Sequence, residues 1–302
     1  MFFKQLEAFH AVVKYGGFER ASASIHVTQP AISTRVKELE KQFGAKLFMR
    51  LGRRAHLTDA GRIVEEYATR LMIVINEMNQ AVDELKGLQR GYLRCGSGTT
   101  IAVHVLPKIL VQFKKHFPNI EVALLVGNNA ETEKRILSDE SDIAIVTRIT
   151  NPESLRIFHF LSDEFVLITP RDHPLTKLRR VSLKQVAKTP LILREAGSYT
   201  RTIIDEGFRA AGISYRCIME FETTEILKSA VAEGLGCSLV SLSSVQKEKR
   251  MGLLTYARIS GVPMKREFKA IMHKDKSLSG PLKPFLELLK IKVNSPPAER
   301  KK

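Results

Sequence analysis

Residues 16–44 read GGFERASASIHVTQPAISTRVKELEKQFG. A short helix over residues 19–25 is followed by a turn, after which Thr28 can cap a second helix with Pro30 in its first turn, where a missing N–H costs nothing. This helix stops at Gly44, and its apolar side chains form one stripe at steps of four, three and four: Ile32, Val36, Leu39 and Phe43. With an earlier helix over residues 6–13, the pattern predicts a helix-turn-helix, whose second helix enters the major groove of DNA.

The face opposite this stripe carries amide, hydroxyl and cationic side chains, the groups that read base edges or hold phosphates. Residues 46–54 follow with four basic residues and no acid between short apolar arms, which predicts a basic wing. An alternative is a solvated helical bundle with ordinary surface charge. The apolar stripe, the helix cap, the polar face and the basic hairpin together favour DNA binding over this alternative. Ten residues are expected to contact DNA: Gln29, Pro30, Ala31, Ser33, Thr34, Arg35, Lys37, Arg50, Arg53 and Arg54.

Thr58 and Asp59 open a long helix whose apolar residues alternate steps of three and four over more than three heptads. This spacing predicts a coiled-coil seam between two copies of the chain. A dimer of helix-turn-helix units predicts an inverted-repeat DNA site, because the operator mirrors the symmetry of the protein. Seven residues are expected to form the dimer contact: Val64, Tyr67, Leu71, Val74, Met78, Ala81 and Leu85.

These residues resemble the LysR-type bacterial transcriptional regulators. The family's signature is matched at fixed offsets through residues 17–33 and continues in register to residue 61. Thr28 for the usual serine, Ser22 for a usual alanine and Ile25 for a common leucine are mild departures. The resemblance implies a winged helix-turn-helix, a linker-helix dimer and an effector domain like periplasmic solute-binding proteins. Such regulators usually act as tetramers that bend promoter DNA and work with RNA polymerase.

The predicted fold class is therefore α plus α/β, in several domains. From Gly91 strands and helices alternate, a rhythm that implies mostly parallel sheets with binding sites at the carboxyl ends of the strands. As the family topology implies, two lobes joined by two strands would form a hinged cleft. The predicted parts are a DNA-binding domain (1–58), a linker helix (59–90), an effector domain (91–295; lobe 1 about 91–163 and 266–295, lobe 2 about 164–265) and a disordered basic tail (296–302).

Three turns in this domain offer hydroxyl and backbone N–H groups, which suit an anion or another polar ligand. They are residues 97–100, residues 147–148 and residues 197–201, and the resemblance adds Thr223. Alternatives are that each hydroxyl merely caps its helix and that the arginines form surface salt bridges. The expected effector-binding residues are Ser97, Gly98, Thr99, Thr100, Thr147, Arg148, Ser198, Tyr199, Thr200, Arg201 and Thr223.

Arg148 and Arg201 beside these hydroxyls favour a small anion over an apolar ligand. Residues 106–128 and 232–236 resemble LysR-type regulators of carbon-fixation or sulfur-assimilation operons. Those members of the family sense phosphorylated metabolites or small sulfur-containing anions.

The 302 residues carry a net charge of +16, which favours an anionic partner such as nucleic acid. No apolar run approaches the roughly 18 residues that cross a bilayer, and the start lacks the apolar stretch of a signal peptide. Without zinc spacing or catalytic motifs, we expect a cytoplasmic protein that is not an enzyme and uses no cofactor or metal. Two rivals stay open: an exported solute-binding protein, and a DNA-packaging protein that does not prefer one palindrome over random DNA.

Overall fold

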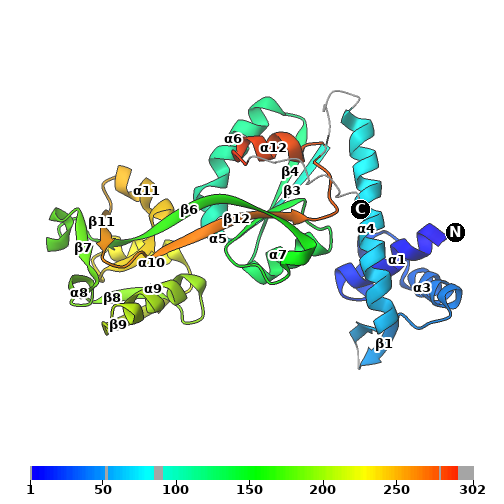
Figure 1. Ribbon diagram of the computed structural model, residues 1–302, viewed down its shortest axis with the longest axis horizontal. Helices are drawn as coiled ribbons and strands as arrows, with labels where there is room; N and C mark the ends of the chain where they lie inside the picture. Colours follow the sequence, from blue (N-terminus) through cyan, green and yellow to red (C-terminus); the bar gives the residue numbers. More distant parts are fainter. Residues whose placement is uncertain (1, 52–53, 85–90, 279, 292–302) are drawn as a thin grey trace, which may run out of the picture.

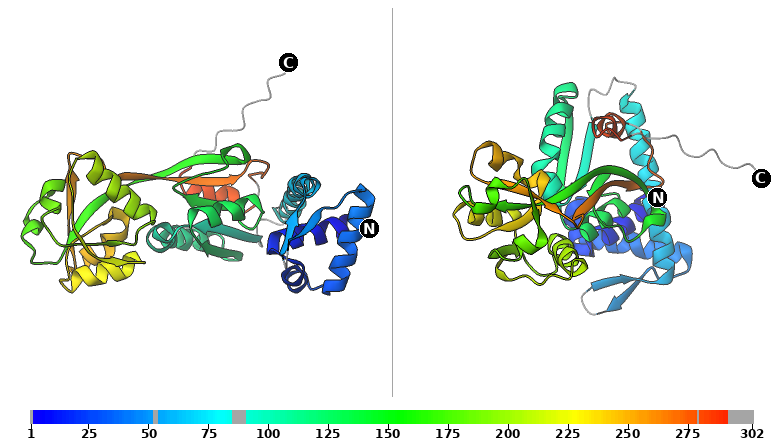
Figure 2. Two further views of the ribbon diagram at one scale, coloured as in Figure 1. Left: turned by 90° about the horizontal axis from the view of Figure 1, so that it is seen from below. Right: turned by 60° about the vertical axis from the view of Figure 1, so that its left-hand side comes forward.

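The computed structural model describes residues 2–51, 54–84, 91–278 and 280–291. Figures 1 and 2 show an elongated molecule in which a helical head and one lobe of the predicted effector domain (lobe 2) lie at opposite ends, with lobe 1 between them. In the part of the chain so described, no helix is both long and apolar enough to cross a membrane.

The head consists of three helices and a two-stranded wing. Its elements are α1 (Phe2–Tyr15), α2 (Phe18–Ser24), α3 (Gln29–Phe43), β1 (Phe48–Leu51) and β2 (Arg54–Leu57). Thr28 precedes α3 in an extended conformation, and Gly44 ends it in the left-handed region at φ 63°. The predicted helix-turn-helix is confirmed, because the stripe of α3 packs into a core shared with α1 through Ile32, Val36 and Leu39.

One residue of the predicted stripe lies elsewhere. Phe43 is exposed at the end of α3 and meets Phe2 edge-on, with the ring centres 6.1 Å apart. The wing is anchored to α3 by Glu40, whose buried carboxylate accepts the Leu47 N–H at 3.0 Å and pairs with Lys46 at 2.8 Å. These bonds fix where the antiparallel β1–β2 hairpin leaves the helix.

The linker helix α4 (Asp59–Glu84) has one face on the head and another exposed. Ala68 is buried in the core of the head. Val64, which is predicted for the dimer contact, packs against this core, whereas its neighbour Ile63 is exposed. The side chain of Ala81 and all of Leu85 lie outside the described residues. The exposed apolar stripe, called here the α4 stripe, consists of Ile63, Tyr67, Leu71, Val74, Met78 and Val82.

Lobe 1 is a parallel β-unit covered by helices. Strand β3 pairs in parallel with both β4 and β5, and the ring of Phe113 meets that of Phe285 edge-on at 5.4 Å in the core. The elements of lobe 1 are β3 (Gly91–Ser97), α5 (Thr99–His104), α6 (Leu106–His116), β4 (Ile120–Val126), α7 (Asn129–Leu137), β5 (Ile143–Val146), η1 (Pro152–Ser154) and α12 (Leu282–Leu288).

Lobe 2 has its own two apolar clusters, one on each side of its strands. Strands β8 and β9 pair in parallel in a separate small sheet. The elements of lobe 2 are η2 (Pro174–Lys177), β7 (Arg180–Ser182), α8 (Leu183–Val186), β8 (Leu191–Arg194), α9 (Tyr199–Ala210), β9 (Cys217–Phe221), α10 (Thr224–Ala232), β10 (Ser238–Ser241), α11 (Leu242–Arg250) and β11 (Thr255–Ser260).

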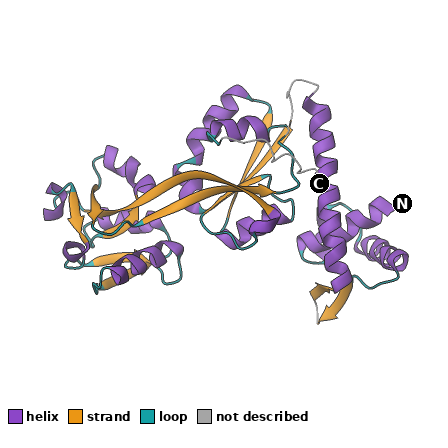
Figure 3. Ribbon diagram, viewed as in Figure 1, coloured by secondary structure: helices purple, strands orange, loops and turns teal. Residues whose placement is uncertain are grey.

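Two long strands join the lobes, as Figure 3 shows: β6 (Leu155–Thr169) and β12 (Lys265–His273). They pair antiparallel because β6 leaves lobe 1 and β12 returns to it. The far half of β6 also pairs antiparallel with β10 and β11. The prediction of mostly parallel sheets is therefore wrong for the strands around this crossing, where the sheet order is β4-β3-β5-β12-β6-β11-β7.

Lobe 1 also contacts the head and the linker helix. The Lys14 ammonium lies 3.5 Å from the carbonyl oxygen of Asp139, and Arg70 of α4 pairs with Asp275 at 3.0 Å. Behind this contact lies a buried ionic cluster, in which the Lys276 ammonium is 2.6 Å from the carboxylates of both Asp139 and Asp142. The head is thus attached to the effector domain by polar contacts in addition to the chain itself.

Candidate functional site

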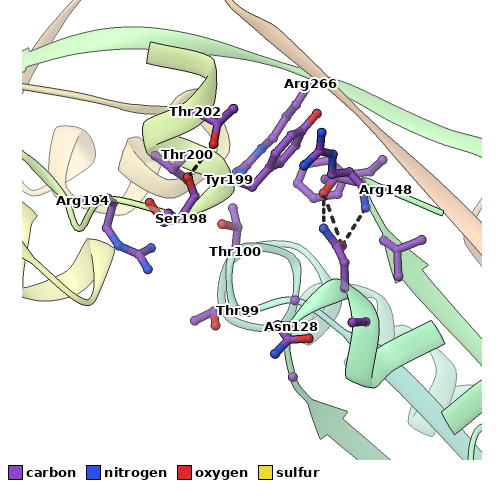
Figure 4. Close-up of a pocket in the computed structure, with 18 of the residues that line it drawn as sticks. Thr99, Thr100, Asn128, Arg148, Arg194, Ser198, Tyr199, Thr200, Thr202 and Arg266 are labelled. Atoms are coloured by element: carbon purple, nitrogen blue, oxygen red, sulfur yellow. Dashed lines mark hydrogen bonds between the residues drawn. The ribbon is translucent and has the colours of Figure 1, made fainter. Parts of the chain in front are cut away.

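A cavity of about 790 Å³ opens between the two lobes, beside the crossing strands. Its size lies within the range of small-molecule sites, roughly 300–1,000 Å³. Most of its polar lining comes from turns at the carboxyl ends of strands, where helices begin (Figure 4). Eight of the predicted effector-binding residues line it: Gly98, Thr99, Thr100, Thr147, Arg148, Ser198, Tyr199 and Thr200.

On the lobe 1 side, the first residues of α5 face the cavity. Gly98 occupies the cap position of this helix, and no side chain caps it. Among the described residues the hydroxyls of Thr99 and Thr100 have no hydrogen-bond partner, so capping does not account for them. They are available to a ligand.

On the lobe 2 side, the hydroxyl groups are partly used by the protein. Ser198 caps α9 by accepting the N–H of Arg201 at 3.2 Å, and Thr202 donates to the Ser198 carbonyl at 3.2 Å. For Ser198, capping and facing the cavity therefore coexist. Thr200 lines the same wall between them.

Three predicted residues do not line the cavity. Ser97 is buried, and its hydroxyl donates to the Gly98 carbonyl at 3.1 Å. Thr223 is exposed and caps α10 by accepting the Ile226 N–H at 3.2 Å. Arg201 points into an ionic cluster on lobe 2, where it pairs with Asp205 at 2.9 Å and with Glu220 at 2.7 Å. Burial alone would lower the pKa of Arg201, but the bonds to Glu220 and Asp205 outweigh it and raise that pKa.

The cavity also contains polar residues that sequence reasoning missed: Asn128, Asn129, Glu133, Arg194, Thr202 and Arg266. Asn129 fixes Thr147, because its side-chain oxygen accepts the Thr147 N–H at 3.1 Å. Asn128 and Asn129 follow the carboxyl end of β4, so the rule applied to the other turns could have found them. Arg266 carries no such signal, since only the return of β12 brings it to the site.

Three arginines line the cavity, and two of them are paired with carboxylates: Arg194 with Glu195 and Arg266 with Asp163. Arg194 is held by Glu195 at 2.8 and 2.9 Å, and the Glu133 carboxylate accepts the backbone N–H groups of residues 150 and 151. Arg148 is exposed and has no carboxylate partner among the described residues. Its guanidinium carbon lies 5.2 Å from the ring centre of Tyr199 on the other lobe. The cavity is therefore suited to a negatively charged ligand.

The side of the head that is predicted to face DNA is open. Gln29, Thr34 and Lys37 are exposed along α3, while Ser33 and Arg35 are half-buried beside them. Pro30 is exposed and Ala31 half-buried in the first turn. Arg50 and Arg54 lie in the paired strands of the wing; their side chains and all of Arg53 fall outside the described residues.

A helix-turn-helix head joined through a long helix to a two-lobed domain with a polar cavity defines a DNA-binding regulator that carries its own ligand-binding domain. The chain belongs to the LysR family: residues 3–62 match its bacterial regulatory helix-turn-helix proteins, and residues 86–293 match the LysR substrate binding domain. The resemblance predicted from the sequence is thereby confirmed. The protein is a transcriptional regulator and not an enzyme.

Relatives extend over nearly the whole chain. The HTH-type transcriptional activator CmpR of Synechocystis sp. (strain ATCC 27184 / PCC 6803 / Kazusa) is 32% identical over 285 residues, 94% of this chain and 93% of that protein. The RuBisCO operon transcriptional regulator of Allochromatium vinosum is 31% identical over 286 residues, 95% and 94% of the two chains. The name of the second relative agrees with the predicted resemblance to carbon-fixation regulators.

Two solved structures bear on the fold. The regulatory domain of CcmR from Synechocystis PCC6803, in complex with 2-PG, has a TM-score of 0.58 at 31% identity and covers 66% of this chain and 95% of that one. A full-length OxyR variant from Pseudomonas aeruginosa has a TM-score of 0.76 at 20% identity, with coverage of 96% and 93%, which is a likeness of fold alone.

Proposed function

We propose that this LysR-type regulator responds to a small anion bound between its lobes. The observation that carries the proposal is Arg148, a cation without a carboxylate partner among the described residues, which faces the Tyr199 ring across the cavity. The hydroxyls of Thr99 and Thr100 add donors on the lobe 1 wall. A charge-assisted hydrogen bond to an anion is roughly twice as strong as a neutral one, so charge would dominate recognition.

The relatives favour the same class of ligand. The CcmR regulatory domain, which is 31% identical, has been solved with 2-PG, a small anion. Together with the RuBisCO operon regulator among the relatives, this supports a carbon-fixation gene cluster as the target of regulation. In this account the regulator acts in the cytoplasm.

On DNA, we assign the reading of bases to α3 and the contact with phosphates to the basic wing. Gln29, Ser33, Thr34 and Arg35 would face base edges and nearby phosphates, since they share the open side of α3. The α4 stripe would pair two copies, so that two heads read an inverted repeat. Ligand binding would draw the lobes together and change how the heads are presented to DNA and RNA polymerase.

Thermal unfolding of the full chain tests the ligand class. A ligand at 100 times its dissociation constant adds about 2.7 kcal/mol to the free energy of unfolding, which is a readily measured shift. We expect 2-PG, phosphate or sulfate to raise the unfolding midpoint selectively over neutral sugars and amino acids. Equal shifts with all compounds, or none, would contradict an anionic effector.

A further inference from the structure

Arg266 lines the cavity and lies on one of the two strands that join the lobes. It is the second residue of β12 and stands opposite Asp163 of β6, on the pair of strands that joins the lobes. Its side chain lines the cavity and runs beside the ring of Tyr199 (Figure 4). A ligand that contacts Arg266 therefore contacts the hinge itself.

The guanidinium of Arg266 is held away from water in an aromatic slot. Its central carbon lies 4.6 Å from the ring centre of Phe268 and 5.5 Å from that of Phe165, and the residue is only 6% exposed. Burial lowers the pKa of Arg266 even though Asp163 is close. A buried cation needs good partners to offset the loss of its hydration.

Those partners are incomplete. The contact from the Arg266 Nη2 to the Asp163 carboxylate is 3.3 Å long, whereas charge-assisted bonds are usually about 2.7–2.9 Å. The same carboxylate already accepts the Ser241 hydroxyl and both the N–H and the hydroxyl of Ser243. The Nε of Arg266 is buried and has no hydrogen-bond partner among the described residues, so only the Nη groups can offer free donors to a ligand. A side chain with five N–H donors thus has one long bond to protein.

We propose that Arg266, in addition to Arg148, recognises an oxyanion group of the effector, a carboxylate, sulfate or phosphate, through the donors that Asp163 leaves free. The assignment rests on the proposed function, because it takes the cavity as the effector site. The low dielectric of the slot strengthens a bond to a charged oxygen and leaves a neutral ligand unable to offset the cation. Because β12 is one of the two strands that join the lobes, such a bond ties the charge of the ligand to the lobe crossing.

Arg194 provides a matched control for Arg266, because it is a cavity arginine whose donors are largely occupied. It lines the same cavity, but two of its donors are already held by Glu195 at 2.8 and 2.9 Å. Arg194→Met and Arg266→Met each remove one positive charge from the cavity. Only Arg266→Met removes an arginine whose donors are mostly free. If only the loss of charge matters, the two variants should lose the same affinity for the oxyanion. If Arg266 recognises the oxyanion directly, Arg266→Met should lose much more.

The test is isothermal titration of the full-length chain with 2-PG, inorganic phosphate and sulfate at constant ionic strength. We expect Arg266→Met to weaken the affinity for the bound oxyanion about 10- to 100-fold, and Arg194→Met less than about threefold. Because Arg266→Met leaves the Asp163 charge buried, the double variant Asp163→Asn/Arg266→Met is measured as well. It removes both charges of the pair and keeps the test valid if the single variant unfolds.

The outcomes separate the two hypotheses. If the wild type binds an oxyanion and the folded Arg266 variants bind it equally well, the assignment of Arg266 is overturned while the proposed function stands. An equal loss in Arg194→Met also overturns it. If the wild type binds none of the three anions, the proposed function fails and the assignment fails with it.

Discussion

The side-chain amide of Asn76, in the linker helix, donates a hydrogen bond of 2.7 Å to the carboxylate of Asp139 in lobe 1. Asp139 is buried at φ 51° in the turn after α7 and is held there by Lys276 at 2.6 Å. The opposite end of this nine-residue helix lies at the cavity, where Asn129 fixes Thr147. A single helix therefore runs from the candidate effector site to the contact with the DNA-binding head.

This contact should determine how the head sits on lobe 1. The double variant Asn76→Ala/Arg70→Ala removes one hydrogen bond and one partly exposed ion pair, each contributing about 1 kcal/mol or less. We expect a larger radius of gyration in small-angle X-ray scattering, with the thermal midpoint of the effector domain unchanged. Asn79→Ala, on the exposed side of α4, is the control. Identical scattering curves for all three proteins would show that the contact does not hold the head.

His10 should make stability depend on pH. Burial, and next the nearby Lys14, lower the pKa of His10 to about 4 from its ordinary 6.5. Below about pH 6.5 the unfolded chain takes up a proton that the folded chain refuses, so the free energy of unfolding falls as the pH drops toward 4. The full effect is about 3 kcal/mol. His10→Gln should lose less stability across this window in urea unfolding series, and parallel curves would refute the prediction.

The α4 stripe should mediate dimerisation. The double variant Leu71→Glu/Met78→Glu would place charges in an apolar contact that excludes water, and we expect monomers by light scattering with loss of operator binding. Asn79→Glu adds the same side chain on α4 but away from the stripe and should leave the dimer intact. A stable dimer of the Leu71→Glu/Met78→Glu variant would locate the interface elsewhere.

Two hydroxyl deletions should separate ligand binding from helix capping. Thr100→Val removes a hydroxyl without a protein partner among the described residues, so it should weaken the ligand about fivefold without loss of stability. Ser198→Ala also removes the cap of α9 and should lower the free energy of unfolding by about 1 kcal/mol. Calorimetry and thermal unfolding measure both effects. Unchanged affinity in Thr100→Val would remove α5 from the site.

Arg35 should contribute to specific DNA binding. We expect Arg35→Ala to cost about 1–3 kcal/mol in affinity for the operator, measured by fluorescence anisotropy at fixed salt. Arg209→Ala, on the exposed end of α9, is a control for the loss of one positive charge far from the head. Equal operator affinities of the Arg35 variant and the wild type would take Arg35 off the reading surface.

The helices of the head could be predicted from local sequence signals. Several features of the cavity and of α4 could not, because they depend on tertiary contacts. The start of α3 at Gln29 and its end at Gly44 follow from a cap, a proline and a glycine, all within one stretch of chain. The position of Arg266 depends on the return of β12 from lobe 2, which no local pattern encodes. For Arg201, the acid four residues later on α9 offered a warning, because Asp205 pairs with it and helps turn it from the cavity. Val64 and Ile63 are adjacent and both apolar, so the sequence does not distinguish them. Packing against the head determines that Val64 is partly covered and Ile63 is exposed.

Hydrogen–deuterium exchange of the full chain, with and without a bound oxyanion, tests the central claim most directly. If the anion binds between the lobes, backbone amides in residues 98–100, 147–150 and 194–202 should exchange more slowly in its presence, since a ligand shifts these turns toward the closed state. The α4 and α7 regions would report whether the head contact responds. Protection confined to other segments, or none at a saturating concentration of an anion that binds, would contradict a ligand site between the lobes.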